Sequence, residues 1–175
     1  LVTRGNRRNY FFILLVLALG GAGVLFQWAP RAGLVLGLDV VLFVIAVVAG
    51  RVVPSFTNNA IPGVGARRIA LLERAALASI LVLALADALQ LPAAPVALAA
   101  ALLHAIRLAL WSPWATRGRP ILWILHASYG WVVVHLALRG FADLGLVSPL
   151  LATHALTVGG IGGLTLGMMS RTARG

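Results

Sequence analysis

The sequence contains no cysteine, and this absence excludes several kinds of metal and redox site. Disulfides, iron–sulfur clusters and haem iron ligated by a thiolate all depend on cysteine sulfur. Any metal held by this chain must therefore be bound mainly by histidine. Met168, Met169 and the few carboxylates are lesser candidates.

Charge is also scarce, and it is almost entirely of one sign. Only four residues are acidic, whereas fourteen are basic and every one of these is arginine. Charged residues make up 10% of the chain and hydrophobic residues 61%, a composition typical of an integral membrane protein. A net charge of +10 can indicate nucleic-acid binding, but these arginines lie between apolar runs rather than in one stripe. We therefore expect a lipid bilayer, and no nucleic acid, as the partner.

Apolar runs long enough to cross a bilayer occur six times, and Pro30, Pro92 and Pro113 mark connections between them. The expected spans are residues 10–28, 33–53, 69–91, 95–111, 120–138 and 149–169. The second span is expected to end in the run Gly50–Pro54, which makes residues 54–68 a surface connection. The sequence thus predicts an all-α polytopic transmembrane helix bundle, with residues 1–175 forming a single transmembrane domain.

The arginines are concentrated at alternate connections, and this asymmetry predicts the orientation. Only Arg31 and Arg139 belong to the connections on one side. The other side holds Arg4, Arg7, Arg8, Arg51, Arg67, Arg68, Arg74, Arg107, Arg117, Arg119, Arg171 and Arg174. Because cytoplasmic connections carry an excess of arginine, both ends of the chain are expected on the cytoplasmic side.

Four histidines in the apolar stretches give the strongest functional signal. His126 and His135 are nine residues apart, so on one helix they face opposite sides about 13 Å apart and need different partners. Depth in the membrane matches His104 with His126 and His135 with His154. Two imidazoles at equal depth could ligate a haem iron from both sides or supply two ligands to copper.

The alternative is that a histidine only forms a hydrogen bond between helices. We favour that alternative for His104 and His135 taken singly. His126 has Tyr129 on nearly the same face, and a glycine-rich segment follows His154, so these two are the better ligand candidates.

Small residues recur at intervals of four after His154, at Ala155, Gly159, Gly163 and Gly167. The stripe allows close packing against another helix, or room for the flat face of a porphyrin. Beside His154 the two interpretations have equal weight.

Three charged residues also lie inside or near the expected spans. Arg107 could hold a haem propionate through charge-assisted hydrogen bonds, or extend its guanidinium to the lipid headgroups. Asp39 could orient a ligating histidine or transfer protons. Glu73 is expected to pair with Arg51 or a neighbouring arginine.

Three segments, with a weaker fourth, carry a resemblance to a known family. They are Gly50–Asn58, Leu122–Trp131 and His154–Arg171, with His104–Trp111 as the weaker one. In order and spacing they resemble the NnrS proteins. The resemblance implies a bacterial inner-membrane protein that contains haem and copper and takes part in the response to nitric oxide and in protection against nitrosative stress.

The resemblance also implies a protein with about twice as many spans, so this chain would be a piece of a longer polypeptide and its missing halves would be partners. Context and resemblance together make His126 and His154 the first candidates for metal ligands. His104, His135, Arg107 and Tyr129 are further candidates for cofactor binding. The resemblance leaves open whether the protein catalyses a reaction or only binds nitric oxide, and no catalytic residue is assigned.

Two other function classes fit the residues. A proton-coupled transporter would use Asp39, the histidines and the glycine breaks as its pathway. A b-type electron carrier would bind haem and need no copper.

Overall fold

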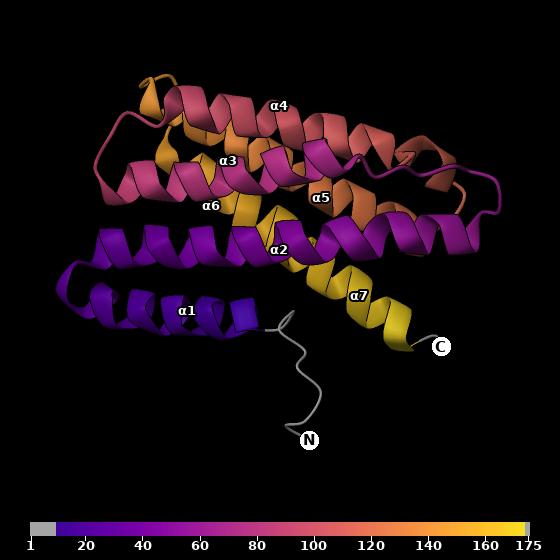
Figure 1. Cartoon of the computed structure of the whole chain (residues 1–175), viewed down its shortest axis with the longest axis horizontal. Helices are drawn as coiled ribbons and strands as arrows, with labels where there is room; N and C mark the ends of the chain where they lie inside the picture. The colour runs from indigo at the N-terminus through magenta and orange to yellow at the C-terminus, as the bar shows by residue number, and fades with distance from the viewer. Residues whose placement is uncertain (1–9, 174–175) are drawn as a thin grey trace.

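The computed structural model describes residues 10–173, and it is built of six helical rods (Figure 1). The first five rods are α1 (Tyr10–Trp28), α2 (Pro30–Ala60), α3 (Ala70–Ala88), α4 (Ala94–Leu110) and α5 (Pro120–Asp143). The last rod joins α6 (Pro149–His154), the π-helical segment η3 (Ala155–Gly162) and α7 (Gly163–Ala173). A short 3-10 turn, η2 (Pro113–Thr116), precedes α5. The all-α prediction is confirmed, while Arg4, Arg7, Arg8 and Arg174 of the orientation argument lie outside the described residues.

Three of the rods are long and apolar enough to cross a membrane. They are Pro30–Ala60, Pro120–Asp143 and Pro149–Ala173, and Phe12–Trp28 and Ala94–Leu110 are shorter apolar helices. α3 is different because it carries Glu73, Arg74 and Asp87. Many large apolar side chains, such as Leu14 and Val16 in α1, are exposed on the outside of the bundle. This surface fits a hydrocarbon environment better than water.

The predicted end of the second span is wrong. α2 continues through Pro54 to Ala60, so the connection to α3 begins at Ile61 rather than at Pro54. A proline inside a helix removes one backbone hydrogen bond, but apolar helices tolerate it when neighbouring groups satisfy the freed carbonyl. Asn58 then fixes the short connection, because its side-chain amide exchanges two hydrogen bonds of 2.9 Å with the backbone of Ala66.

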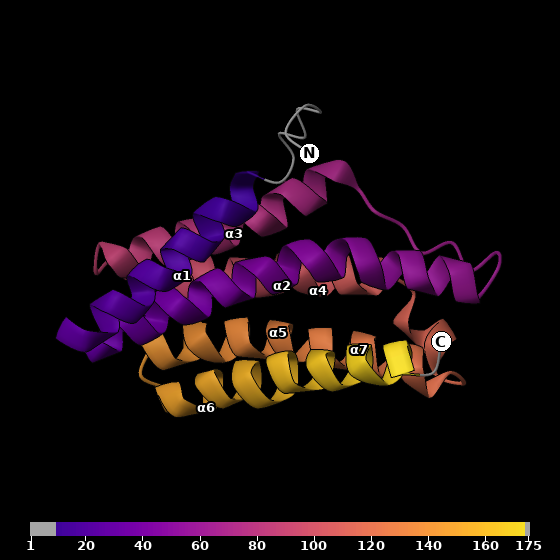
Figure 2. The ribbon, with the colours of Figure 1, turned by 90° about the horizontal axis from the view of Figure 1, so that it is seen from below.

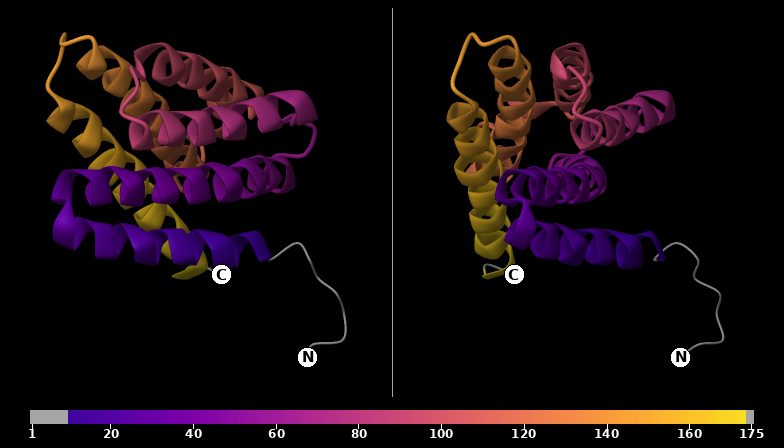
Figure 3. Two further views of the ribbon diagram at one scale, coloured as in Figure 1. Left: turned by 60° about the vertical axis from the view of Figure 1, so that its left-hand side comes forward. Right: turned by 90° about the vertical axis from the view of Figure 1, so that its left-hand side faces the viewer.

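α5 is the central helix of the bundle. It packs against α2 and α4 and along the whole length of the last rod. The last rod lies on one flank beside α5, and α3 lies on the opposite flank (Figures 2 and 3). α1 packs mainly on α2 at the edge. Both faces of α5 are therefore covered by other helices.

Alanine makes the interior of the bundle narrow. Ala46, Ala76, Ala97 and Ala100 are fully buried, together with larger side chains that include Leu42, Leu83, Leu125 and Leu136. Small side chains allow helices to approach closely, which is how helices associate where the hydrophobic effect between them is weak.

Candidate functional site

A buried ion pair joins α3 to α4. Arg107 donates from Nε to Oε1 of Glu73 over 2.9 Å and from Nη2 to Oε2 over 2.6 Å, and its side chain is only 1% exposed. Gly50 of α2 makes the space for this guanidinium, since a Cβ atom there would overlap Arg107 Nη2. Glu73 thus has Arg107 as its main partner, with exposed Arg68 at 3.8 Å, so of the two expected alternatives the neighbouring arginine, and not Arg51, is the one found among the described residues.

The same guanidinium starts a chain of hydrogen bonds that crosses into α5. Arg107 Nη1 donates to the hydroxyl of Tyr129 over 2.7 Å. That hydroxyl donates to Nδ1 of His104 over 2.6 Å, and His104 Nε2 donates to the carbonyl of Ala76 over 3.0 Å. This direction of donation is required because a carbonyl can only accept. Both nitrogens of His104 are therefore in use, and Arg107 is turned inward, so its predicted extension to the headgroups is wrong.

His126 is also enclosed by protein groups. Nδ1 lies 3.0 Å from the carbonyl of Leu122, one turn earlier in α5. Nε2 faces the hydroxyl of Thr57 at 3.3 Å and the carbonyl of Trp111 at 3.4 Å. His104 and His126 do lie on two helices that pack together, but their hydrogen bonds run to different partners. The pairing of these two imidazoles by their depth in the membrane stays a prediction, because the two rings have no hydrogen-bond partner in common among the described residues.

His135 has one bonded and one unpaired nitrogen. Nδ1 donates over 2.8 Å to the carbonyl of Ala152 in α6, whereas Nε2 is buried with no hydrogen-bond partner among the described residues. Asp39 of α2 also has one bonded and one unpaired oxygen. Oδ1 accepts a hydrogen bond of 2.5 Å from Arg139, whereas Oδ2 is buried with no hydrogen-bond partner among the described residues. Asp39 and His135 interact electrostatically. Arg139 also pairs with Asp87, so α2, α3 and α5 are linked here.

His154 is the one histidine of the four on the outside of the described bundle. Its Nδ1 donates over 2.8 Å to the carbonyl of Leu150, one turn earlier. Because that bond places the proton on Nδ1, Nε2 keeps its lone pair, and within residues 12–173 it has no partner. A carbonyl that fixes the tautomer and the ring in this way is the usual companion of a metal-ligating histidine.

The ring of His154 lies at a groove between α5 and the last rod. The groove has a volume of about 590 Å³. Its lining is mostly apolar and includes Trp131, Leu138, Leu151 and Val158. Ligand pockets are commonly of this size, apolar, with few polar groups that fix orientation. Nothing in the sequence indicated this groove, although the exposed Trp131 and Val158 lie in two of the segments that carry the family resemblance.

Ala155, Gly159 and Gly163 of the glycine stripe line this groove, and Gly167 does not. A Cβ atom at Gly159 would overlap Trp131, one at Gly163 would overlap Ser128, and one at Gly167 would lie 2.9 Å from Ile124. The stripe therefore packs closely against α5, which is the structural alternative of the sequence analysis. Of these three glycines only Gly159 lies in the π-helical segment η3, whose wider turn begins directly after His154, while Gly163 and Gly167 belong to α7. Such turns are rare and often lie at functional sites.

A comparison of the chain with protein families shows which family it belongs to. The model of the NnrS protein family matches residues 1–175. The chain belongs to the NnrS family. The resemblance carried by the three segments is thereby confirmed, and two of them, around His126 and His154, form the seam between α5 and the last rod of this NnrS chain. No curated protein and no solved structure matches it.

Proposed function

We propose that this chain is the membrane-spanning part of an NnrS-type protein of the bacterial inner membrane, with six spans and both ends cytoplasmic. The described arginines support this orientation. Arg67 lies beside the end of α4 and Arg119 beside the end of α2, whereas Asp87 and Asp143 lie at the opposite end of the bundle with Arg139. The arginine-rich end would then face the cytoplasm.

We further propose that the groove beside His154 binds haem in the response to nitric oxide and in protection against nitrosative stress. One observation carries this proposal: His154 presents an oriented, unpaired Nε2 atom at an apolar groove. An imidazole nitrogen is a usual axial ligand of haem iron. Bound haem would supply an iron atom able to bind nitric oxide, and the chain's own residues would hold the ring and exclude water.

The other residues named from the sequence have supporting positions in this proposal. His126, His104, Tyr129 and Arg107 all have protein partners, so their part would be to hold α5 in place. His135 keeps one free nitrogen inside the bundle and stays a candidate ligand. A direct role of these groups in cofactor binding remains a prediction.

Copper fits the described residues less well than haem. Residues 12–173 contain no group of three or more His, Cys, Asp or Glu side chains that could hold a metal ion. A copper site of the NnrS family would therefore need ligands beyond those that the structure describes. We assign no step to copper in this chain.

The decisive experiment is haem titration of the purified full chain in detergent. The variant His154→Ala should fold and lose most of the Soret absorbance that the unaltered chain acquires. Thr153→Ala, next to it, is the matched control and should bind haem normally. If His126→Ala abolished binding while His154→Ala retained it, the groove would be the wrong site.

A proton-coupled transporter is the second candidate function. The buried atoms Asp39 Oδ2 and His135 Nε2, which have no hydrogen-bond partner among the described residues, favour it, because ionisable groups inside a membrane often belong to proton pathways. A full chain that acquires no Soret band with excess haem, yet moves protons in sealed vesicles, would support this alternative.

A further inference from the structure

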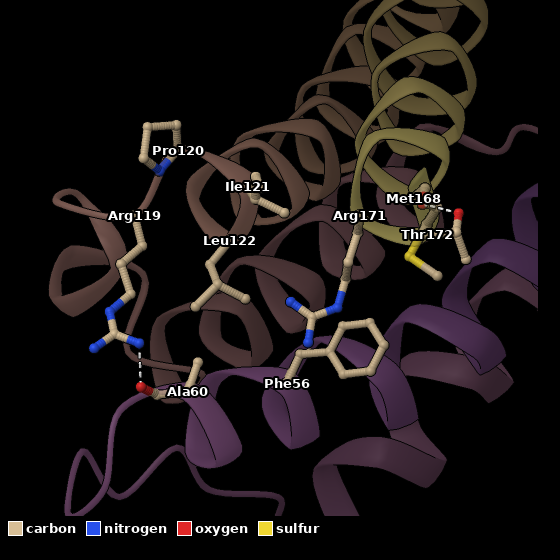
Figure 4. Close-up of a pocket in the computed structure, with 9 residues that line it drawn as sticks. All are labelled: Phe56, Ala60, Arg119, Pro120, Ile121, Leu122, Met168, Arg171 and Thr172. Carbon is tan, nitrogen blue, oxygen red and sulfur yellow. Dashed lines mark hydrogen bonds between the residues drawn. The ribbon is translucent and has the colours of Figure 1, made fainter. Parts of the chain in front are cut away.

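A second hollow lies at the arginine-rich end of the bundle, apart from the histidines. It is a cleft of about 680 Å³ between the end of α2, the start of α5 and the end of α7 (Figure 4). Three segments far apart in the sequence meet there, and no histidine lines it. The His154 groove lies between α5 and the last rod but shares no lining residue with this cleft.

Two guanidinium groups reach into the cleft. The Nη1 atom of Arg119 donates to the carbonyl of Ala60 at the end of α2. Arg171 lies over the ring of Phe56, with 3.9 Å between its Cζ atom and the ring centroid. Protein groups thus hold both side chains, and Figure 4 shows the guanidinium of Arg119 beside Ala60 and that of Arg171 beside Phe56.

Neither guanidinium is neutralised by an acidic group of the described residues. The ion pairs found within residues 12–173 use Glu73, Asp39 and Asp87 as their acids, and none includes Arg119 or Arg171. Most N–H donors of Arg119 are therefore available to a ligand. The N–H donors of Arg171 are available as well, because they point outward in the plane of the guanidinium, whose face lies on Phe56. Two fixed, uncompensated positive charges at one cleft predict an anionic ligand.

The start of α5 adds to the positive potential of the cleft. α5 begins at Pro120, and no side chain caps its first turn. Pro120 has no amide hydrogen and the amides of Leu122 and Trp123 donate to the carbonyl of Arg119, so what remains is the dipole of the helix, which favours an anion at its N-terminus. This effect supports the two arginines and would not be sufficient alone.

The remaining wall is hydrocarbon. Ile121, Leu122 and Met168 also line the cleft, and Figure 4 shows Leu122 between the two arginines. A free inorganic anion gains nothing from such a wall, whereas an acyl chain does. The ligand therefore has both an anionic head and an apolar body.

We propose that this cleft binds an anionic phospholipid of the phosphatidylglycerol class. Arg119 and Arg171 hold its phosphate, and an acyl chain lies along Ile121 and Met168. The choice of a lipid over another amphipathic anion rests on the proposed membrane orientation, which puts this end of the bundle at the cytoplasmic headgroups.

The test is native mass spectrometry of the full chain after removal of its lipids. Phosphatidylglycerol or phosphatidylcholine with identical acyl chains is then added back. The unaltered chain should retain phosphatidylglycerol preferentially, and Arg119→Gln with Arg171→Gln should weaken this retention by at least about tenfold, since two charge-assisted contacts are lost. Arg119→Lys with Arg171→Lys should restore part of it.

Arg117→Gln is the matched control, because Arg117 is an exposed arginine at the same end that stacks on Trp114 outside the cleft. It should leave retention within about twofold of the unaltered chain. Equal loss in this control, equal binding of phosphatidylcholine, or displacement by inorganic phosphate alone would overturn the lipid site.

Haem is measured in the same samples to separate the two proposals. Unchanged lipid retention in His154→Ala would leave this inference standing, whether or not that variant loses haem binding. Haem that displaces the lipid, with a Soret band that the two arginine substitutions abolish, would overturn it in favour of a haem propionate site.

Discussion

Two sets of polar residues, one on each side of α5, differ in how completely their hydrogen bonds are formed. On the face toward α3 and α4, Arg107, Tyr129 and His104 form a chain in which each polar atom has a partner. On the face toward the last rod, His154 presents a free nitrogen to a groove over tightly packed glycines. A saturated network stabilises one arrangement, whereas an unsaturated group beside a hollow can bind something else.

Residue type alone does not show which histidine of this fold keeps a nitrogen without a protein partner. His104 and His154 are both histidines in apolar helices, and both donate to a backbone carbonyl. They differ in whether the second nitrogen meets a protein donor such as the Tyr129 hydroxyl. Four substitutions test the difference between the two sides of α5.

The largest effect is expected from Glu73→Ala on the saturated face. It leaves the Arg107 charge buried without its carboxylate, so the free energy of unfolding should fall by about 3–5 kcal/mol. Arg68→Ala is the control, because this arginine is 47% exposed and 3.8 Å from Glu73, and its loss should cost at most about 1 kcal/mol. Denaturation in mixed detergent measures both, and equal small effects would mean that the network does not stabilise the bundle.

Tyr129→Phe should have the next largest effect. It keeps the aromatic ring, whose centroid lies 4.6 Å from the ring centroid of Trp111, but it leaves Arg107 Nη1 and His104 Nδ1 without the hydroxyl as their partner. The expected loss of unfolding free energy is about 1–3 kcal/mol. In the double variant with Glu73→Ala the two losses should not add, since both residues belong to one network. Simple additivity would argue against a connected chain of bonds.

Gly159→Ala tests the packing on the other face. The new methyl group would overlap Trp131, which costs about 1–3 kcal/mol, but alanine recovers about 1 kcal/mol of helix propensity. We expect a net loss below about 2 kcal/mol together with a change in Trp131 fluorescence. Gly162→Ala is the matched control in the same π-helical segment, because its nearest neighbour would be an ordinary 3.5 Å away. A larger loss in the control would place the close contact elsewhere.

His154→Ala should have the smallest effect on stability and the largest on haem. Its side chain is exposed and bonds only within its own helix, so the free energy of unfolding should change by no more than about 0.5 kcal/mol. Unfolding and haem titration of the same preparation measure the two properties together. A marked loss of stability with haem binding intact would place His154 among the structural histidines.

Parts of this site follow from particular residues in the sequence, and other parts do not. The run from His154 through the glycines indicated both an imidazole and close packing, and both are present at one seam. The charge of Arg107 and Glu73 indicated ion pairs, but their mutual pairing depends on Gly50 of a third helix. The end of α2 was misplaced because Pro54 breaks helices in water far more often than in an apolar bundle.

The sequence by itself determined that this protein is made of apolar helices, that it belongs to the NnrS family, and that sulfur from cysteine holds no metal in it. The helices follow from composition and local periodicity, and the family from a match along the whole chain, and neither needs knowledge of which side chains are neighbours. Only the tertiary structure decided which imidazole nitrogen is left free. That depends on carbonyls and hydroxyls that other helices bring to each ring, such as Ala76 for His104 and Ala152 for His135. A hydrogen bond is a short-range, directional contact, so it is settled when the helices pack against one another.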